Sequence, residues 1–389
     1  MEPEPIVRRI MNDFAVDTRI AASDRIGSRY LWTDAFAVCN LLGMFVREHD
    51  EDLRRLALHL VDQVHYVLGR YHPDDPRHGR ISGLDEDEGE EHPTIGGLRI
   101  GKPLPEREPG QAYEDALEWE RDGQYFHYLT KWMHALDRVS RVTRDPRYHR
   151  WAVELAKTAH ARFTYWDRES GRMRMYWKMS IDLGRPLVPS MGQHDPLDGL
   201  ITFLQLDAAR DRTPDLDLGA EIGDMARLCA DQIWVTADPL GIGELLTGAY
   251  KLAQLAADTV IEEPRLLEEI LWSSARGLES LTRQRPFEQS AERRLAFREL
   301  GLAIGLAAVV GIRHLSQLHP HVLTDSVRIS AALETLQRHE HLREEIVAFW
   351  LEPANRESSS WSGHRDINGV MLATSVAPEA YLSLAGPIA

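Results

Sequence analysis

The sequence is poor in cysteine and in long apolar runs, and each shortage excludes a class of protein. Its 389 residues include 2 cysteines, Cys39 and Cys229. Both lie in apolar segments of helical periodicity, so we expect small buried side chains and not a disulfide. There is no run of about 18 apolar residues, so we expect no transmembrane helix. The N-terminal segment lacks the apolar core of a signal peptide, which favours a cytoplasmic location.

Basic residues are also scarce. The chain has 45 Lys and Arg against 61 Asp and Glu, a formal net charge of −16. A polyanion would be repelled on average, so we expect neither nucleic acid nor an anionic membrane as a partner. The zinc-binding patterns CxxC and HExxH do not occur, and the glycine-containing segments follow no strand signal. We therefore expect no metal and no cofactor, and the oligomeric state is left open.

What the sequence has in abundance is helical periodicity, and it comes in pairs of segments with short connections. The first member of each pair is richer in small and apolar residues, as an inner helix needs, and the second carries more charge on one face. Six inner and six outer helices predict an all-α fold, an (α/α)6 toroid of six helical hairpins in a single domain over residues 1–389. The paired segments are 29–49 with 50–71, 122–143 with 145–166, 194–210 with 215–234, 241–257 with 264–282, 294–315 with a long helix near 324–350, and 364–384 with a short helix near 3–13.

Two segments interrupt this rhythm. Residues 72–118 are rich in proline, glycine and acid, and a connection of this length inside a compact domain is usually functional. We expect its acidic run, Asp85 to Glu91, to be solvated, and the remainder to form a folded loop that covers a cleft at one rim of the toroid. In residues 171–193, apolar and basic residues alternate between Met173 and Met179, which predicts a short β element followed by an extended loop.

Polar and aromatic residues gather at the start of each inner segment. "DGQYFHY", from Asp122 to Tyr128, is one example, and "GQHDPLD", from Gly192 to Asp198, is another. A single acid at a helix start is usually an N-cap. Capping does not explain the histidines and aromatic rings beside these acids. Because all inner helices of a toroid run in the same direction, their starts converge on one rim, and we interpret that rim as a ligand-binding cleft.

This architecture resembles the six-hairpin glycosidase superfamily, over nearly the whole chain. The segments "DGQYFHYLTKWMHAL" and "MGQHDPLDGLI" are similar to segments of bacterial proteins of that type without an assigned activity. The superfamily includes glucanases, glucoamylase-like enzymes, unsaturated glucuronyl hydrolases and, on a related barrel, N-acylglucosamine 2-epimerases. The resemblance implies a small carbohydrate as the ligand, but it does not determine the reaction, because one fold supports many chemistries.

Glycoside hydrolysis of short oligosaccharides is the favoured reaction. One carboxylic acid protonates the leaving oxygen while a second carboxylate activates water. Asp122 and Asp195 are the first candidates, with Glu244 and Asp366 in reserve. Trp132 is a further candidate for stacking on a sugar face, and Lys178 or Arg365 for holding an anionic group. The predicted substrate-binding residues are Trp32, Asp34, Tyr125, His127, Lys178, His194, Asp198, Trp361, His364 and Arg365.

Three alternatives remain open. A sugar 2-epimerase would pass a proton between two histidines at carbon 2 of the open-chain sugar, and His127, His194 and His364 are available for this. A lyase would use Tyr125 or His194 as the base, with Arg365 neutralising a uronate. A non-catalytic sugar-binding protein on the same fold is the third possibility. Such a protein would have no two carboxylates within about 10 Å of each other across the cleft.

Overall fold

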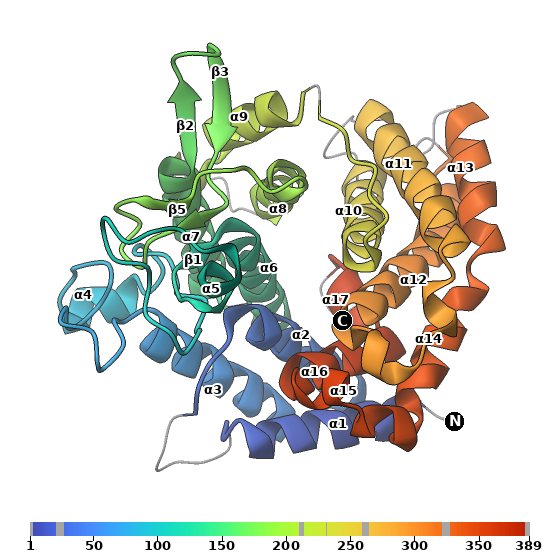
Figure 1. Ribbon diagram of the computed structural model, residues 1–389, viewed down its shortest axis with the longest axis horizontal. Helices are drawn as coiled ribbons and strands as arrows, with labels where there is room; N and C mark the ends of the chain where they lie inside the picture. Colours follow the sequence, from blue (N-terminus) through green and yellow to red (C-terminus); the bar gives the residue numbers. More distant parts are fainter. Residues whose placement is uncertain are drawn as a thin grey trace. The chain divides into compact units, whose positions relative to one another are not determined.

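The computed structural model describes residues 3–20, 27–209, 214–230, 232–258, 264–320 and 327–385. The chain divides into two compact units (Figure 1). The N-terminal unit comprises Ala15–Gln232 and Ala385–Ala389, and the C-terminal unit comprises Ile233–Leu384 and Met1–Phe14. One domain over residues 1–389 stays a prediction. None of the described helices is both long and apolar enough to cross a membrane.

The N-terminal unit is built from three helical hairpins, as predicted. In each hairpin the two helices pack against each other, and the first helices also pack on one another, α2 on α6 and α6 on α8. These first helices form the inner layer. The hairpin helices are α2 (Leu31–Glu48) with α3 (Glu51–Leu68), α6 (Phe126–Thr143) with α7 (Pro146–Phe163), and α8 (Asp195–Ala209) with α9 (Gly219–Cys229), and a 3-10 turn, η1 (Pro214–Leu216), precedes α9.

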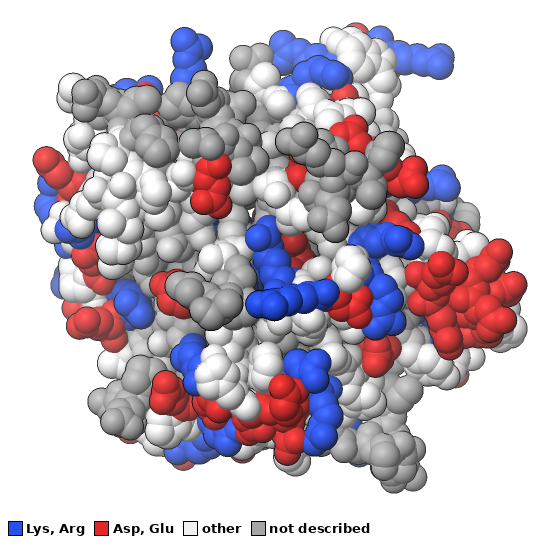
Figure 2. Space-filling model, turned by 180° about the vertical axis from the view of Figure 1, so that it is seen from behind, with Lys and Arg blue, Asp and Glu red and all other residues white. Residues whose placement is uncertain are grey.

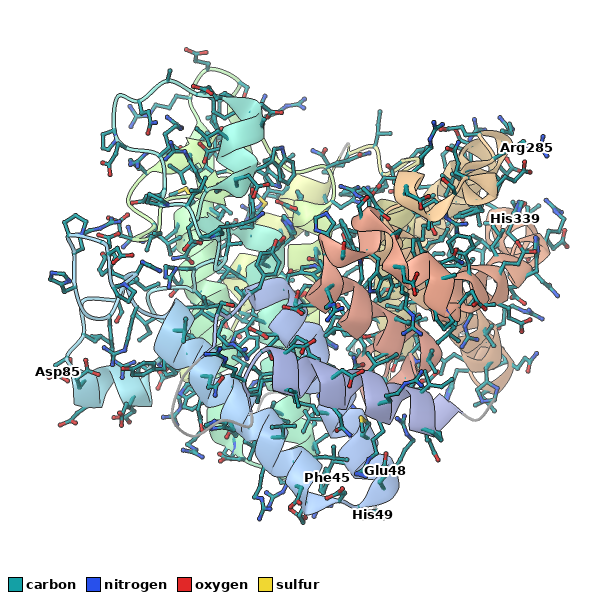
Figure 3. The ribbon with its side chains drawn as sticks, turned by 60° about the horizontal axis from the view of Figure 1, so that its bottom comes forward. Phe45, Glu48, His49, Asp85, Arg285 and His339 are labelled. Atoms are coloured by element: carbon teal, nitrogen blue, oxygen red, sulfur yellow. The ribbon has the colours of Figure 1, made fainter. Side chains whose placement is uncertain are left out.

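Local sequence signals explain the short connections in these hairpins. The α2 helix ends at His49, whose left-handed backbone (φ 54) lets its N–H donate to the carbonyl of Phe45 (Figure 3). The next helix begins at once, because the Asp50 carboxylate accepts from the N–H of Asp52. The Asp145 carboxylate caps α7 in the same way, and Pro146 occupies the first helical position.

Short strands accompany the second hairpin. β1 (Gln124–Tyr125), β4 (Lys178–Met179) and β5 (Pro186–Val188) form a three-stranded sheet in the order β1-β4-β5, all antiparallel. β2 (Thr164–Asp167) and β3 (Arg172–Met175) form a separate hairpin, at the top of Figure 1. The predicted β element of residues 173–179 is therefore present as parts of two strands that belong to different sheets.

The long connection 72–118 contains two short helices, α4 (Glu86–Glu91) and α5 (Asp115–Glu120), of which the second extends past the predicted boundary. The acidic run is solvated as predicted, because its carboxylates are exposed on α4. Figure 2 shows them as a dense acidic group at the right edge of that view. Asp85 caps the helix by accepting from the N–H of Glu88 (Figure 3).

The C-terminal unit repeats the inner and outer pattern. α10 packs on α12 and α12 on α16, while α11 and α13 pack on each other outside them. The prediction of one long helix near 324–350 is wrong, because this segment forms two helices that are separated by residues 339–340. Its first three residues lie outside the described chain. The elements of this unit are α1 (Pro3–Asp17), which runs beyond it, α10 (Pro239–Ala257), α11 (Pro264–Arg283), η2 (Pro286–Glu288), η3 (Ala291–Arg293), α12 (Ala296–Leu318), α13 (Val327–Arg338), α14 (His341–Leu351), η5 (Pro353–Glu357), α15 (Ser359–Ser362), α16 (Arg365–Val376) and α17 (Glu379–Leu382).

Two glycines set the close approach of α10 and α12. A Cβ added to Gly305 would lie 2.6 Å from both the Cα and the carbonyl oxygen of Gly243. Backbone atoms cannot move aside as a flexible side chain does. We therefore expect Gly305→Ala to lower the free energy of unfolding by about 1–3 kcal/mol through overpacking, as measured by chemical denaturation.

Gly369→Ala is the matched control, because Gly369 also lies within an inner helix, α16. A Cβ there meets only the Ile10 side chain, at 3.7 Å. Its gain in helix propensity, up to about 1 kcal/mol, should leave stability equal or higher. Equal effects of the two substitutions would contradict the packing argument.

Candidate active site

The start of α6 is held in place by the side chain of Gln124. Its Oε1 accepts from the N–H of Leu98 at 2.8 Å, and its Nε2 donates to the carbonyls of Gly96 at 3.0 Å and Ile181 at 2.7 Å. Gly97 adopts φ +72, and a Cβ there would lie 2.1 Å from the Gln124 amide oxygen. One buried amide thus joins the long connection, the β sheet and α6, and so fixes the residues that follow it.

His127 and Asp195 face each other across two inner helices. His127 lies in the first turn of α6, and its Nδ1 is 3.5 Å from Oδ1 of Asp195, the first residue of α8. Gly192 allows the loop before α8 to lie close to this carboxylate, because a Cβ there would be 2.7 Å from it. Burial, together with the charge of Lys131 and against the opposing effect of Asp198, lowers the pKa of His127 to about 3. The imidazole is therefore neutral at physiological pH.

Asp198 stands one helical turn from Asp195 and is already engaged. Its Oδ2 accepts from the ammonium of Lys131 at 2.8 Å and from the hydroxyl of Thr130. The ion pair places a positive charge close to His127. Asp198 was predicted as a substrate-binding residue, and in the structure its carboxylate is the partner of Lys131.

Aromatic rings surround the entrance to α6, and we call Tyr30, Trp119, Tyr125, Tyr128 and Trp177 the aromatic cluster. Tyr125 is its centre and is only 3% exposed. The Tyr125 ring centroid lies 5.2 Å from Trp177, 5.2 Å from Tyr128 and 5.3 Å from the His127 imidazole. The hydroxyls of Tyr30 and Tyr128 are hydrogen bonded at 2.6 Å. Burial raises the pKa of Tyr30 to about 12, so its hydroxyl stays protonated.

A cavity of about 700 Å³ lies between the long connection and the loop after β4. Asp122 and Glu106 are among its lining residues, but both carboxylates are bound. Asp122 is paired with the Arg99 guanidinium and accepts from the N–H groups of Gly101 and Lys102 at 3.0 and 3.3 Å. These contacts engage both oxygens of Asp122 and anchor its side chain to the long connection. The structure therefore favours a framework role for Asp122 in place of the predicted catalytic one.

Glu106 is held in a similar way on the same cavity wall. One of its oxygens lies 2.8 Å from Arg77 Nη2, and the other accepts from the N–H of Ile181. Lys102 lines the cavity as well, and its ammonium stands 5.9 Å from the Tyr30 ring centroid. The cavity and the aromatic cluster are therefore neighbours.

Four other predicted binding residues of this unit are buried in its framework. The Lys178 ammonium is fully buried and donates to the carbonyls of Glu118 at 2.6 Å and Arg121 at 2.8 Å, so it is not placed to hold a substrate anion. Trp32 packs on Phe36 in the core instead of facing a sugar. Trp132 is buried and donates to His65 at 3.1 Å. The carboxylate of Asp34 accepts from the N–H of Tyr30 at the start of α2.

The remaining predicted residue of this unit is His194, which is half-buried directly before α8. Its carbonyl accepts from the N–H of Asp198 at 3.0 Å, which starts the helix. The imidazole belongs to the residue adjacent to Asp195 in the chain. Of the two histidines, His127 contacts the Asp195 carboxylate.

Five predicted residues belong to the C-terminal unit. Trp361 is buried and stacked on Trp350, with ring centroids 5.6 Å apart. The His364 ring lies 5.5 Å from that of Phe297. His364, Arg365 and Asp366 are exposed at the start of α16, and Glu244 is half-buried in the first turns of α10. The His127–Asp195 contact belongs to the N-terminal unit. A role for these five residues in binding or catalysis stays a prediction.

Several residues of the site were not among the predicted ones. Trp119 and Trp177 lie outside the inner helices, and Lys131 lies one turn inside α6 on the same face as His127. Helical spacing links His127 to Lys131, since residues four apart share a face. No sequence signal brings Trp119 to Trp177, because that contact depends on the fold of the long connection.

No protein-family model matches the chain, and no curated protein sequence matches it. Among solved structures it is similar to a sugar epimerase from a ruminal bacterium, with a TM-score of 0.50, 11% identity, and coverage of 96% of this chain and 98% of that one. It is also similar to the cellobiose 2-epimerase of Spirochaeta thermophila DSM 6192, with a TM-score of 0.49, 12% identity, and coverage of 96% and 98%. The first likeness shows a common fold. This agrees with the predicted fold class, an all-α (α/α)6 toroid.

Proposed function

We propose that the chain is a carbohydrate-active enzyme that epimerises or isomerises a sugar by moving the proton at carbon 2. The observation that carries this is the neutral His127 imidazole, oriented by Asp195 beside an aromatic cluster. The fold is shared with a sugar epimerase, which supports the same class of reaction. Glycoside hydrolysis, favoured from sequence, becomes the second candidate, and non-catalytic sugar binding the third.

The chemistry requires a base, a hydrogen-bond donor and a second proton carrier. A carboxylate beside Nδ1 favours the tautomer with the proton on that atom, which leaves the Nε2 lone pair of His127 as the base. His127 would remove the carbon 2 proton of the open-chain aldose while its carbonyl oxygen gains a proton, giving an enediol. Returning a proton to the opposite face of carbon 2, and releasing the one on oxygen, gives the epimer. No atom is gained or lost overall.

Other residues near His127 suit the remaining roles. The hydroxyl of Tyr128, bonded to Tyr30, is a donor for the carbonyl oxygen, and its ring centroid is 4.8 Å from the imidazole. His194, one of the three histidines predicted from sequence for this reaction, is the candidate for the second proton transfer. Hydrolysis is the weaker candidate because Asp122, one of its two first candidates, is paired with Arg99 and accepts from two backbone N–H groups.

We also propose that residues 72–118 cover this site. The support is the attachment of Gly96 and Leu98 to Gln124, three residues before His127, and the attachment of Arg99 to Asp122. A cover held at the start of α6 would exclude water from an enediol, which is otherwise prone to side reactions.

Proton NMR in D2O tests the proposed reaction. The protein is incubated with glucose, mannose, N-acetylglucosamine and their β-1,4-linked disaccharides, and the carbon 2 proton signal is followed. We expect deuterium at carbon 2 and the appearance of the epimer, without cleavage. Release of monosaccharide from the disaccharides would select hydrolysis instead. A rise in melting temperature with neither reaction would select a binding protein.

A further inference from the structure

The aromatic cluster contains one exposed indole, Trp119, which packs against the half-buried indole of Trp177. Trp119, on α5, is 44% exposed, and its ring centroid lies 4.7 Å from that of Trp177 with the planes at 75°. Both rings rest on the buried Tyr125, at 6.3 and 5.2 Å. An exposed indole that is packed edge-on against a second indole offers a flat apolar surface to a ligand.

The rings are fixed in place before any ligand arrives. Tyr125 is paired with Lys178 in the β1–β4 ladder, and Trp177 directly precedes Lys178. The Lys178 ammonium donates to the carbonyl of Glu118, the residue before Trp119, and its ion pair with the Glu118 carboxylate spans 3.1 Å. A buried lysine thus ties α5 to the sheet beneath the two indoles. A rigid aromatic surface loses little conformational entropy on binding.

The two indoles lie close to the proposed base. Tyr125 contacts both indoles and also the His127 imidazole, whose ring centroid is 5.3 Å from that of Tyr125. The indoles are therefore one ring removed from the imidazole. A ligand that reacts at His127 and extends by one further ring would reach Trp119.

We propose that Trp119 and Trp177 form a second sugar-binding subsite, so that the substrate is a disaccharide or longer oligosaccharide. This rests on the proposed function. The reducing-end sugar would open and react at His127, and the next sugar would lay its C–H face on the indoles. A pyranose suits this surface, because its faces are apolar while its hydroxyls point outward to water.

Calorimetric binding of glucose and cellobiose to the wild type and to Trp119→Ala tests the subsite. We expect the wild type to bind cellobiose at least about tenfold more tightly than glucose, the equivalent of about 1.4 kcal/mol, and Trp119→Ala to lose that preference. Trp119→Phe, with a smaller ring, should keep part of it. Trp166→Ala is the control, because Trp166 is 60% exposed on β2 and lies outside the aromatic cluster. Its preference should equal that of the wild type.

The outcomes separate this subsite from the proposed reaction. Equal affinity of the wild type for the two sugars, no binding of either, or a preference that survives Trp119→Ala in a protein of unchanged melting temperature, would overturn the subsite. Proton exchange at carbon 2 is measured separately on both sugars. A binding preference that depends on Trp119, without exchange, would keep the subsite and reject the reaction.

Discussion

Replacing His127 by glutamine should lower the rate of proton exchange at carbon 2 by about 10²- to 10⁴-fold, the usual contribution of a general base. Glutamine is similar in size and can still face Asp195, so the fold should persist. It has no lone pair basic enough to remove a proton from carbon. The expected loss is therefore in kcat, with a smaller change in KM, as measured by NMR exchange under saturating sugar.

His160→Gln is the matched control for that experiment. His160 on α7 also faces a carboxylate, with its Nε2 3.0 Å from Asp224, and that carboxylate is not the one that His127 contacts. Its exchange rate should stay within about twofold of the wild type. Similar losses in the two variants would trace the effect to a general disturbance of histidine–carboxylate pairs, and an unchanged rate in His127→Gln would remove His127 from the reaction.

The pH dependence follows from the same environment. Burial and the Lys131 charge lower the pKa of His127 to about 3, so its neutral form persists far below pH 6.5. The acid limb of kcat/KM that belongs to His127 should thus lie well below the ordinary histidine range. Lys131→Met should move that limb to higher pH, for two reasons of the same sign. It removes a positive charge, and it leaves Asp198 without its ammonium partner.

The hairpin rhythm could be predicted because inner and outer helices need different residues. Small apolar residues such as Gly243 and Gly305 are necessary where two helices approach closely, and they are visible in the sequence. The division of the helix near 324–350 was not predictable in this way. The residues at the break, His339 and Glu340, are neither glycine nor proline, so tertiary packing and not local propensity ends α13 there.

The candidate site was predicted only in outline, because composition gives a helix start but not the direction of each side chain. His127 and Asp195 were both predicted as site residues, and their contact depends on the relative rotation of α6 and α8. Lys178 resembled a ligand for an anion, yet the strand that carries it turns its side chain inward to Glu118. In a strand, a shift of one residue in register decides whether a side chain faces the interior or the solvent.

The sequence and the structure lead to opposite expectations for the substitution Asp122→Asn. As a general acid it would tolerate asparagine in folding and lose activity. In the structure it is 2% exposed and neutralises Arg99, which is itself buried. Removing one partner of a buried ion pair leaves the other charge unpaired, at a cost of about 3–5 kcal/mol. We therefore expect Asp122→Asn to lower the free energy of unfolding by about that amount, as measured by denaturant titration.

The second partner makes this prediction specific. Arg99→Met combined with Asp122→Asn removes both charges, so the double variant should be less destabilised than the sum of the single ones. Glu288→Gln breaks the exposed pair with Arg285 and should change stability by less than about 1 kcal/mol. Wild-type stability in Asp122→Asn, together with a hundredfold loss of glycoside cleavage, would restore the general acid and the hydrolase with it. A large loss of stability, with residual exchange at carbon 2 in the folded fraction, would leave Asp122 as the anchor of the connection that covers His127.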